Sequence, residues 1–300
     1  MKKKTYLFAL MAMVLTLGSC SDNENGIGGE TSQYITVSTS IGNMTRVATD
    51  AKGGQTFEEG DEISVYAWTG DATIAPDASE RVVNNAINKL TNGSWVSTPQ
   101  MLWKNNRDKH YFIGVYPTAA ISDLSAGEYT FDANKQTESD LLVAVNPDGL
   151  SYSADAQQTV PLTFTHVMAK LAVNLTYKNQ WGGIPTVEKV VVGNAAKEAT
   201  INYLTKVVTP STTAKEDFSL PEITENTKYV SVIIPQEEVT QLTIVIGGKN
   251  FVYDNGTPFK LESGKITTVN LEVGRDEIKL GDVKITNWED GSTFSGEALN

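Results

Sequence analysis

The chain has few of the residues from which catalytic and metal-binding sites are usually built. Its 300 residues include one cysteine, Cys20, and two histidines, His110 and His166. A single cysteine excludes a disulfide within the chain, so the fold must be held together by its hydrophobic core. Because neither histidine has a second histidine or a cysteine at ligand spacing, we expect no zinc or haem site and no cofactor.

Basic residues are also scarce. The chain carries 24 lysines and arginines against 36 aspartates and glutamates, a net charge of −12. This balance argues against a nucleic-acid partner, whose recognition needs a basic face. The sequence also lacks the serine elbow of hydrolases, a phosphate-cradling glycine loop and the register of an EF-hand. It therefore predicts a protein that is not an enzyme.

A long hydrophobic run is missing too, because the apolar stretch at residues 5–17 is too short to span a bilayer as a helix. It is instead typical of a signal peptide, since three lysines at residues 2–4 precede it and Leu17-Gly-Ser-Cys20 follows it. We predict a lipoprotein signal peptide at residues 1–19, with Cys20 as the palmitate-carrying first residue of the mature chain. The alternative is a core cysteine that follows a hydrophobic stretch by chance.

Residues 20–33 are polar, acidic and rich in glycine. Such a composition cannot bury apolar area and predicts a flexible tether. Without the lysines of the signal, the 24 basic residues fall to 21 against 36 acidic ones, so the mature chain would carry a net charge of −15. Several acyl chains on Cys20 would hold it on a bacterial outer membrane essentially permanently. The acidic run also resembles a surface-export signal of bacterial lipoproteins, although a plain linker explains it equally well.

The rest of the sequence has the pattern of β-strands almost throughout. Short runs that alternate, or that are rich in β-branched and aromatic residues, are separated by clusters of Gly, Asn, Asp and Pro. These runs lie at residues 34–41, 63–68, 111–116, 141–145, 171–177, 187–192, 230–234 and 242–246. Residues 80–90 have a pattern that could be mistaken for a helix, but Asn92-Gly93 follows at once. Since no helices alternate with the strands, we predict an all-β chain of β-sandwiches.

A polar stretch at residues 152–159 indicates a division of the chain. A new series of strands opens at Leu162, so the boundary is placed near Val160-Pro161. We predict an N-terminal β-sandwich at residues 34–160 and a C-terminal β-sandwich at residues 161–300. No short repeat is present that would indicate a solenoid or a propeller.

Three groups of residues could carry a site, and each has a structural explanation that we favour. The carboxylates around Gly60 could form an acid pair or a calcium site, but a solvated turn before a strand fits them better. The tryptophans could stack on sugars, but packing in a core or an interface is the default. His166 is expected to be packed and hydrogen-bonded rather than catalytic. The carboxylates are Glu58, Glu59, Asp61 and Glu62, and the tryptophans are Trp68, Trp95, Trp103, Trp181 and Trp288.

An ordered set of short motifs carries a resemblance to a known family. After the lipobox, a strand ends at Met44-Thr-Arg-Val47, and Phe57-Glu-Glu-Gly-Asp-Glu-Ile63 follows. Later motifs come in order at residues 111–117, 141–144, 162–166, 234–236 and 288–291. Each motif alone is weak, but the ordered set covers nearly the whole chain. It resembles the fimbrillin family of Bacteroidales, the Mfa-like or type V pilins.

The resemblance implies two tandem β-sandwiches of transthyretin-like, Greek-key type and export as a lipoprotein. It also implies that a trypsin-like protease removes the N-terminal strand after an arginine, and that a strand from a neighbouring subunit fills the vacated groove. On this chain the removable strand would be residues 34–46, with the cut between Arg46 and Val47. Arg46 could instead be an ordinary loop arginine, and Lys52 is a second candidate for the cut.

Residues 34–41 have the pattern that such a removable strand needs. Ile35, Val37 and Ile41 lie on one side of an alternating strand. Removing it would expose a sheet edge and an apolar groove, a configuration that demands a partner. Addition of a strand from another chain would satisfy both the backbone groups and the side-chain pockets.

Residues 276–288 are the natural donor for the exchange. Apolar residues stand at the even positions Ile278 and Leu280 and then at the odd positions Val283 and Ile285. A β-bulge at the intervening glycine would place all four on one face. The segment is equally consistent with the last strand of the second sandwich.

These observations together predict a structural or accessory subunit of a cell-surface fimbria, assembled by protease-activated donor-strand exchange and serving adhesion. The expected partners are other fimbrial subunits, identical or related, a trypsin-like protease, the outer membrane through the lipid, and a host or glycan ligand. A first alternative is a monomeric surface glycan-binding lipoprotein of a polysaccharide-uptake system. A second alternative, an enzyme on a β-sandwich scaffold, lacks a convergent catalytic set.

Overall fold

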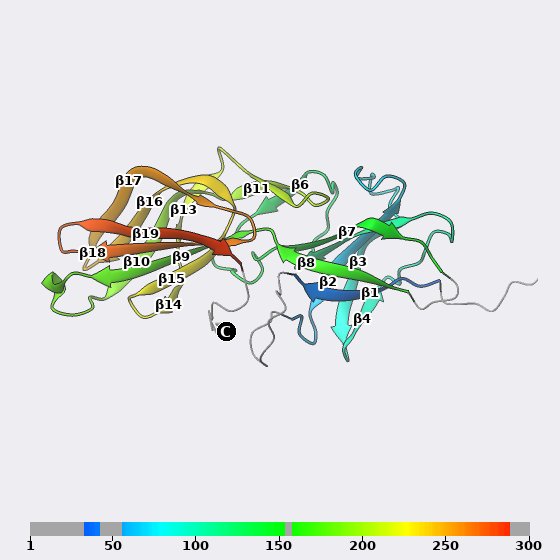
Figure 1. The fold of residues 1–300 in the computed structure, drawn as a ribbon, viewed down its shortest axis with the longest axis horizontal. Coiled ribbons are helices and arrows are strands. Elements are labelled where there is room, and N and C mark those ends of the chain that lie inside the picture. Colours follow the sequence, from blue (N-terminus) through cyan, green and yellow to red (C-terminus); the bar gives the residue numbers. More distant parts are fainter. Residues whose placement is uncertain (1–32, 43–55, 154–157, 289–300) are drawn as a thin grey trace, which may run out of the picture. The chain divides into compact units, whose positions relative to one another are not determined.

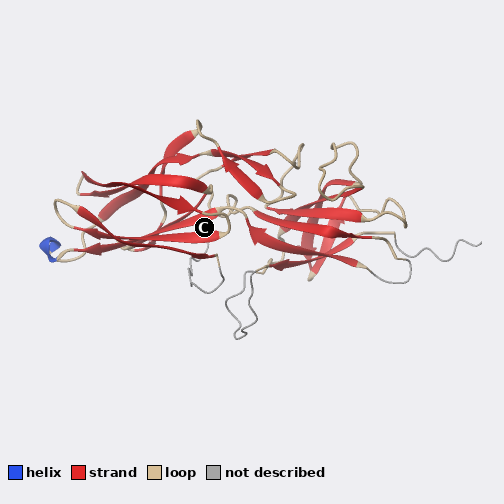
Figure 2. Cartoon of the chain, turned by 45° about the horizontal axis from the view of Figure 1, so that its top comes forward, coloured by secondary structure: helices blue, strands red, loops and turns tan. Residues whose placement is uncertain are grey.

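The computed structural model describes residues 33–42, 56–153 and 158–288 (Figure 1). Nineteen strands make up most of this part of the chain, and its one helical segment is the 3-10 turn Asn179–Trp181 (Figure 2). The predicted all-β fold is confirmed. Within the described ranges, no helix is long and apolar enough to cross a membrane.

The first sheet has seven strands, in the order β1-β8-β7-β5-β2-β3-β4. All neighbours are antiparallel except β1, which runs parallel to β8 at the edge. Most of residues 80–90, whose pattern could be mistaken for a helix, lies in β3. A tight hairpin joins β3 to β4 because Asn92 and Gly93 both take positive φ angles, of 50° and 74°. The strands are β1 (Thr36–Ile41), β2 (Glu62–Thr69), β3 (Val83–Thr91), β4 (Ser94–Thr98), β5 (His110–Tyr116), β7 (Leu142–Leu150) and β8 (Thr159–His166).

Three further sheets hold the remaining strands, in the orders β14-β15-β9-β18-β19, β13-β10-β16-β17 and β12-β11-β6. The five-stranded sheet contains β9 (Ala169–Tyr177), β14 (Glu222–Thr224), β15 (Lys228–Ile233), β18 (Lys265–Val273) and β19 (Ile278–Asn287). The four-stranded sheet contains β10 (Val187–Ala196), β13 (Lys215–Ser219), β16 (Gln236–Ile246) and β17 (Lys249–Leu261). The three-stranded sheet contains β6 (Gly127–Thr130), β11 (Glu198–Asn202) and β12 (Val207–Pro210).

The central strands of the first sheet, β2 and β5, are buried on both faces. Along β2, Val65 and Ala67 pack into one hydrophobic cluster, the first core, while Tyr66 and Trp68 pack into another, the second core. Because successive side chains of a strand point to opposite faces, a strand covered on both sides is apolar along most of its length. The first core is Ile35, Val37, Ile63, Val65, Ala67, Val83, Ala86, Met101, Trp103, Phe112, Leu142, Ala144, Val160, Leu162 and Phe164. The second core also takes in residues of the other three sheets.

The expected boundary at Val160-Pro161 lies inside β8. That strand pairs with β1 and β7, and its Val160, Leu162 and Phe164 fill the first core, so it belongs to the first sheet. The chain changes sheet after His166 instead. In addition, β6 pairs with β11 from the second half of the chain. The division into domains at residues 34–160 and 161–300 stays a prediction, and the sheets do not follow its boundary.

Candidate functional site

The N-terminal strand β1 lies at the edge of the first sheet and covers the first core. It pairs in register with β8, beginning with Thr36 opposite Thr159. Ile35 and Val37 are only 2% and 6% exposed, and Ile41 is half-buried against the same core. The alternation of residues 34–41 therefore turns these apolar side chains inward, while their role in strand exchange stays a prediction.

The other side of β1 faces β4, the strand at the opposite edge of the same sheet (Figure 1). The backbone N–H of Ile35 donates a hydrogen bond to the carbonyl oxygen of Met101 at 2.9 Å. Further along, the indole Nε1–H of Trp95 donates to Oγ1 of Thr39 at 3.0 Å. A regular ladder thus holds β1 on the β8 side, and isolated hydrogen bonds hold it on the β4 side.

The sequence offers Trp95 only as one of five tryptophans that could stack on sugars, and it does not single out Thr39 or the contact between the two. Thr39 has the same parity as Val37 and Ile41, so it faces inward with them. A polar residue at an inward position needs a hydrogen-bond partner, and this was the signal in the sequence that could have found the pair.

Phe57 closes one end of the first core. Its ring packs edge-on against Trp95, Tyr116 and Phe164, with centroid distances of 5.3, 5.4 and 5.1 Å. The N–H of Gly42, just after β1, donates to the carbonyl oxygen of Phe164 at 2.7 Å. The end of β1, through Gly42, and the Phe-x-x-Gly-Asp-x-Ile motif, through Phe57, therefore both contact Phe164.

The predicted lipidation and processing residues lie outside the described ranges. Cys20 falls in residues 1–32, while Arg46, Val47 and the second candidate Lys52 fall in residues 43–55. Lipidation at Cys20 and cleavage between Arg46 and Val47 therefore stay predictions.

The C-terminal strand β19 lies at the edge of the five-stranded sheet, antiparallel to β18. Leu280 and Val283 pair with residues that are only two apart on β18, so the two residues between them oppose a single residue. This is the β-bulge expected from the sequence. Ile278, Leu280 and Val283 pack half-buried against the second core, whereas Ile285 is 38% exposed. Their role as a donor strand stays a prediction.

Trp288, the residue after β19, packs against the end of β8. Its ring stacks on that of His166, and the ammonium group of Lys170 lies 4.1 Å from its ring centroid. Nδ1 of His166 is 2.8 Å from Oδ1 of Asp140. His166 is thus packed and hydrogen-bonded, as predicted, and Trp288 belongs to the protein interior.

His110 is also fully buried and hydrogen-bonded. Its Nε2 accepts the backbone N–H of Lys104 at 3.0 Å, which leaves Nδ1–H to donate to the carbonyl oxygen of Asp108 at 3.1 Å. Burial lowers the pKa of His110. Both ring nitrogens are therefore used in holding the turn before β5, and the ring is kept neutral.

The acidic turn around Gly60 is held by local contacts. The carboxylate of Asp61 accepts the N–H of Glu58 at 2.7 Å, and that of Glu59 accepts a backbone N–H of the neighbouring hairpin at 2.8 Å. Glu62 forms an ion pair with Lys89 at 3.0 Å. In the part of the chain that the structure describes, no three His, Cys, Asp or Glu residues are grouped to hold a metal ion.

The remaining tryptophans pack against protein as well. Trp68 and Trp103 are buried in the second and first cores. Trp181 is half-buried against the second core, and its Nε1–H donates to the carbonyl oxygen of Val273 at 2.9 Å. These contacts agree with core and interface packing rather than with an exposed sugar-stacking surface.

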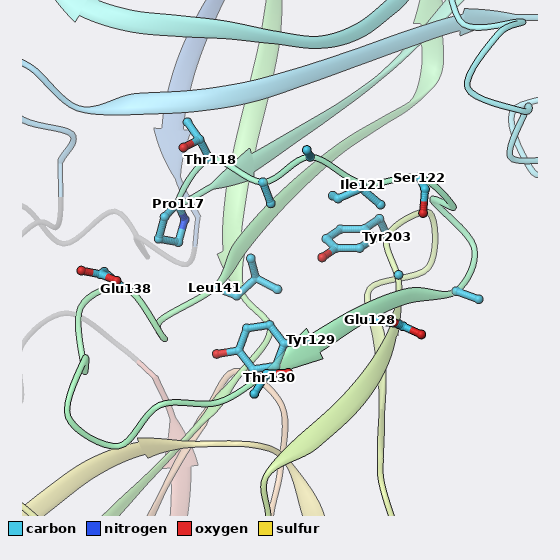
Figure 3. Close-up of a pocket in the computed structure, with 14 residues that line it drawn as sticks. Pro117, Thr118, Ile121, Ser122, Glu128, Tyr129, Thr130, Glu138, Leu141 and Tyr203 are labelled. Atoms are coloured by element: carbon cyan, nitrogen blue, oxygen red, sulfur yellow. The ribbon is translucent and has the colours of Figure 1, made fainter.

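A cavity of about 530 Å³ lies beside β6 (Figure 3). Residues 117–122, β6, Leu141 and Tyr203 line it, and the hydroxyl group of Tyr203 points into the open space (Figure 3). The hydroxyl of Tyr129 donates to the carbonyl oxygen of Ser139 at 2.8 Å, and burial raises the pKa of Tyr129 to about 12. Two carboxylates, Glu128 and Glu138, also line the cavity, so it offers polar as well as apolar surface (Figure 3).

The chain is similar in sequence and in fold to bacterial surface proteins. It is 24% identical to a protein of Bacteroides uniformis described as a candidate fimbrium subunit, Fim1C, over 97% of either chain. Its fold is similar to that of two candidate cell adhesion proteins of known structure. One, from Bacteroides ovatus, has a TM-score of 0.64 at 17% identity and covers 85% of this chain and 98% of its own. The other, from Bacteroides uniformis, has a TM-score of 0.60 at 18% identity and covers 85% and 99%.

The family itself is given by a match that spans most of the chain. Residues 45–288 match the fimbrillin-like family, from the segment after β1 to Trp288. The matched range includes the Phe57 motif, β19 and the ring of Trp288 that packs on β8. The chain belongs to the fimbrillin-like family.

Proposed function

We propose that this chain polymerises by strand exchange after a protease has cut it behind Arg46. Membership of the fimbrillin-like family makes it a structural subunit of a cell-surface fimbrium, and such subunits associate with one another. The proposal adds how the subunit is activated and which strands are exchanged. The observation that carries it is the position of β1 at the edge of the first sheet, over the first core.

In the uncut chain β1 completes the first core. Burying an aliphatic side chain such as Ile35 or Val37 is worth about 1.5–3 kcal/mol, so a tethered β1 stabilises the monomer. A cut after Arg46 removes the tether, and β1 then loses the high local concentration that kept it in place. Its departure would leave the edge of β8 unpaired and the first core open, which favours addition of a strand from a neighbour.

The strand that a subunit gives to its neighbour is proposed to be β19. It is an edge strand whose apolar residues Ile278, Leu280 and Val283 are only half-buried, and the stack of Trp288 on His166 is the main side-chain contact that it must break on leaving its own sheet. The same residues present an alternating apolar face that an open groove can receive. The contrary outcome is that β19 remains the last strand of its own sheet.

The site of assembly is proposed to be the outer membrane. Acylation of Cys20 would anchor the subunit there, and the tether at residues 20–33 would hold the fold clear of the lipid. Cleavage after Arg46 would separate the lipid from the subunit and free it to join a fimbrium that serves adhesion.

The experiment is to treat the purified full chain with a trypsin-like protease and to analyse it on unheated gels. The wild-type chain should lose its N-terminal segment, leave residues 47–300 and form a ladder of multimers. The Arg46→Ala chain should stay monomeric with an unchanged melting temperature. If the protease cuts it after Lys52 instead, the double variant Arg46→Ala, Lys52→Ala should resist cleavage and stay monomeric. Arg107→Ala, in the exposed turn before β5, is the matched control and should behave as wild type. Polymers that still contain β1, or monomers after a clean cut at Arg46, would contradict the proposal.

A further inference from the structure

We infer that Trp95 selects the strand that lies in the β1 groove, and that it favours a strand of a different subunit over β19 from a second copy of this chain. The β1 groove is the surface that β1 covers, formed by β8, β4 and the first core. The inference rests on the proposed strand exchange. It concerns the choice of the entering strand, which the exchange alone leaves open.

The indole ring of Trp95 is held in a fixed orientation. Its ring packs edge-on against Phe57, at 5.3 Å between centroids and 83° between planes. Phe57 is itself enclosed by Tyr116 and Phe164. The Nε1–H of Trp95 therefore points in one direction, and in the described part of the chain it donates to Oγ1 of Thr39 at 3.0 Å.

The hydrogen bond of Trp95 is made at one inward position of the groove. Ile35, Val37, Thr39 and Ile41 face inward, and Thr39 is the third of these four. A strand with an aliphatic residue in third place would leave the half-buried N–H of Trp95 without this acceptor, which is unfavourable. The groove therefore fits the pattern apolar-x-apolar-x-hydroxyl-x-apolar.

The outward side of β1 gives little basis for selection. The hydroxyl groups of Thr36 and Ser40 lie 3.3 and 3.2 Å from those of Thr159 and Thr163 on β8, all at exposed sites. Water can replace such contacts at small cost, so they contribute little to the choice of strand.

The strand β19 does not have this pattern. With its bulge, Ile278, Leu280, Val283 and Ile285 are its four alternating apolar residues. Entering parallel to β8, it would bring Val283 to the third place, and entering antiparallel it would bring Leu280. Without the bulge, a parallel strand that begins at Ile278 would place Asp282 third and Lys284 fourth, which brings two charges toward the first core. Each of these three arrangements fits the groove less well than β1 does. A second copy can therefore enter, but the preferred partner is a related subunit with Ser or Thr in third place.

The experiment measures peptide binding to the wild-type full chain after cleavage at Arg46. The probes are a labelled peptide of residues 33–42, its Thr39→Val and Thr39→Ser variants, and a peptide of residues 276–287. We expect the Thr39→Val peptide to bind about fivefold more weakly than wild type, as the loss of one hydrogen bond implies, and the Thr39→Ser peptide to bind like wild type. The peptide of residues 276–287 should bind more weakly than that of residues 33–42.

The control is the Trp95→Phe chain, which keeps an aromatic ring against Phe57 but lacks the N–H. On it the wild-type and Thr39→Val peptides should bind equally. Equal binding of both peptides to the wild-type chain, or a fivefold difference that persists in Trp95→Phe, would overturn the inference.

Failure of strand exchange itself has a different signature. If no peptide enters the cleaved chain, the exchange and the choice of partner both fail. A double-mutant cycle of Trp95→Phe and Thr39→Val on the unfolding of the uncut chain then still reports whether Trp95 and Thr39 are coupled. If Trp95 and Thr39 are coupled but no strand is exchanged, their hydrogen bond serves only to hold β1 in its own chain. That result would overturn the inference on partner choice.

Discussion

The indole ring of Trp288 lies flat on the imidazole ring of His166, with 3.9 Å between centroids and 6° between planes. The backbone N–H of Trp288 also donates to the carbonyl oxygen of Gly264 at 3.0 Å. His166 ends β8 and Trp288 follows β19, so the stack fastens the end of the C-terminal strand to a strand of the first sheet. A strand that leaves its sheet must first break this contact.

Replacing Trp288 should therefore destabilise the fold. Trp288→Ala removes a side chain that is only 5% exposed, at an expected cost of about 3–5 kcal/mol in the free energy of unfolding. The change is measured by urea denaturation of the uncut monomer, with Ile285→Ala on the exposed part of β19 as control, for which a small effect is expected. An unchanged melting curve together with lost glycan binding would instead favour a sugar-binding role for Trp288.

The inward and outward residues of β1 should differ in their effect on stability. Val37→Ala opens a gap in the first core and should cost about 2 kcal/mol in the free energy of unfolding. The neighbouring Ser38 is exposed, so Ser38→Ala should change it by less than about 0.5 kcal/mol. Equal effects of the two substitutions in chemical denaturation would mean that β1 does not complete the first core.

Stability should fall in mildly acidic solution because of His110. Burial lowers the pKa of this histidine in the folded chain. Above about pH 6.5, the ordinary histidine pKa, the ring is neutral in both states and its contribution is fully present. As the pH falls from there toward the lowered pKa, the unfolded chain takes up a proton that the folded chain resists, so the free energy of unfolding decreases.

The His110→Gln variant isolates this effect. Glutamine can accept one hydrogen bond and donate another but does not titrate, so the variant should lose less stability between about pH 7.5 and about pH 5 than the wild type. Denaturant midpoints at the two pH values provide the measurement. If the free energy of unfolding falls equally in both proteins, the acid sensitivity comes from titratable groups other than His110.

Lipid attachment should depend on one residue. Cys20→Ala removes the thiol that the predicted signal peptidase site presents, so incorporation of labelled palmitate should be abolished and the precursor should remain uncut or mislocalised. Ser19→Ala, which keeps a small residue before the thiol, is the control and should be acylated normally. Normal membrane attachment of the Cys20→Ala chain would show that the lipoprotein assignment is wrong.

Much of the local structure was readable from residue pattern. Residues 34–41 alternate because one side of that strand is buried, and the parity change between Leu280 and Val283 predicted the bulge that β19 has. The expected domain boundary at Val160-Pro161 did not coincide with a change of sheet. A polar stretch before a strand marks the end of a loop, but it does not say with which sheet the next strand will pair.

The sequence by itself determined that the chain is β throughout, which strand faces are apolar, and that one tight turn falls at Asn92-Gly93. These properties depend on neighbouring residues, whose periodicity and backbone preferences act locally. Only the tertiary structure decided that β1 runs parallel to β8, that β6 joins β11, and that Trp95 meets Thr39. Alternation defines an inner face but not its neighbour, because segments far apart in the chain are brought together by the packing of the whole core.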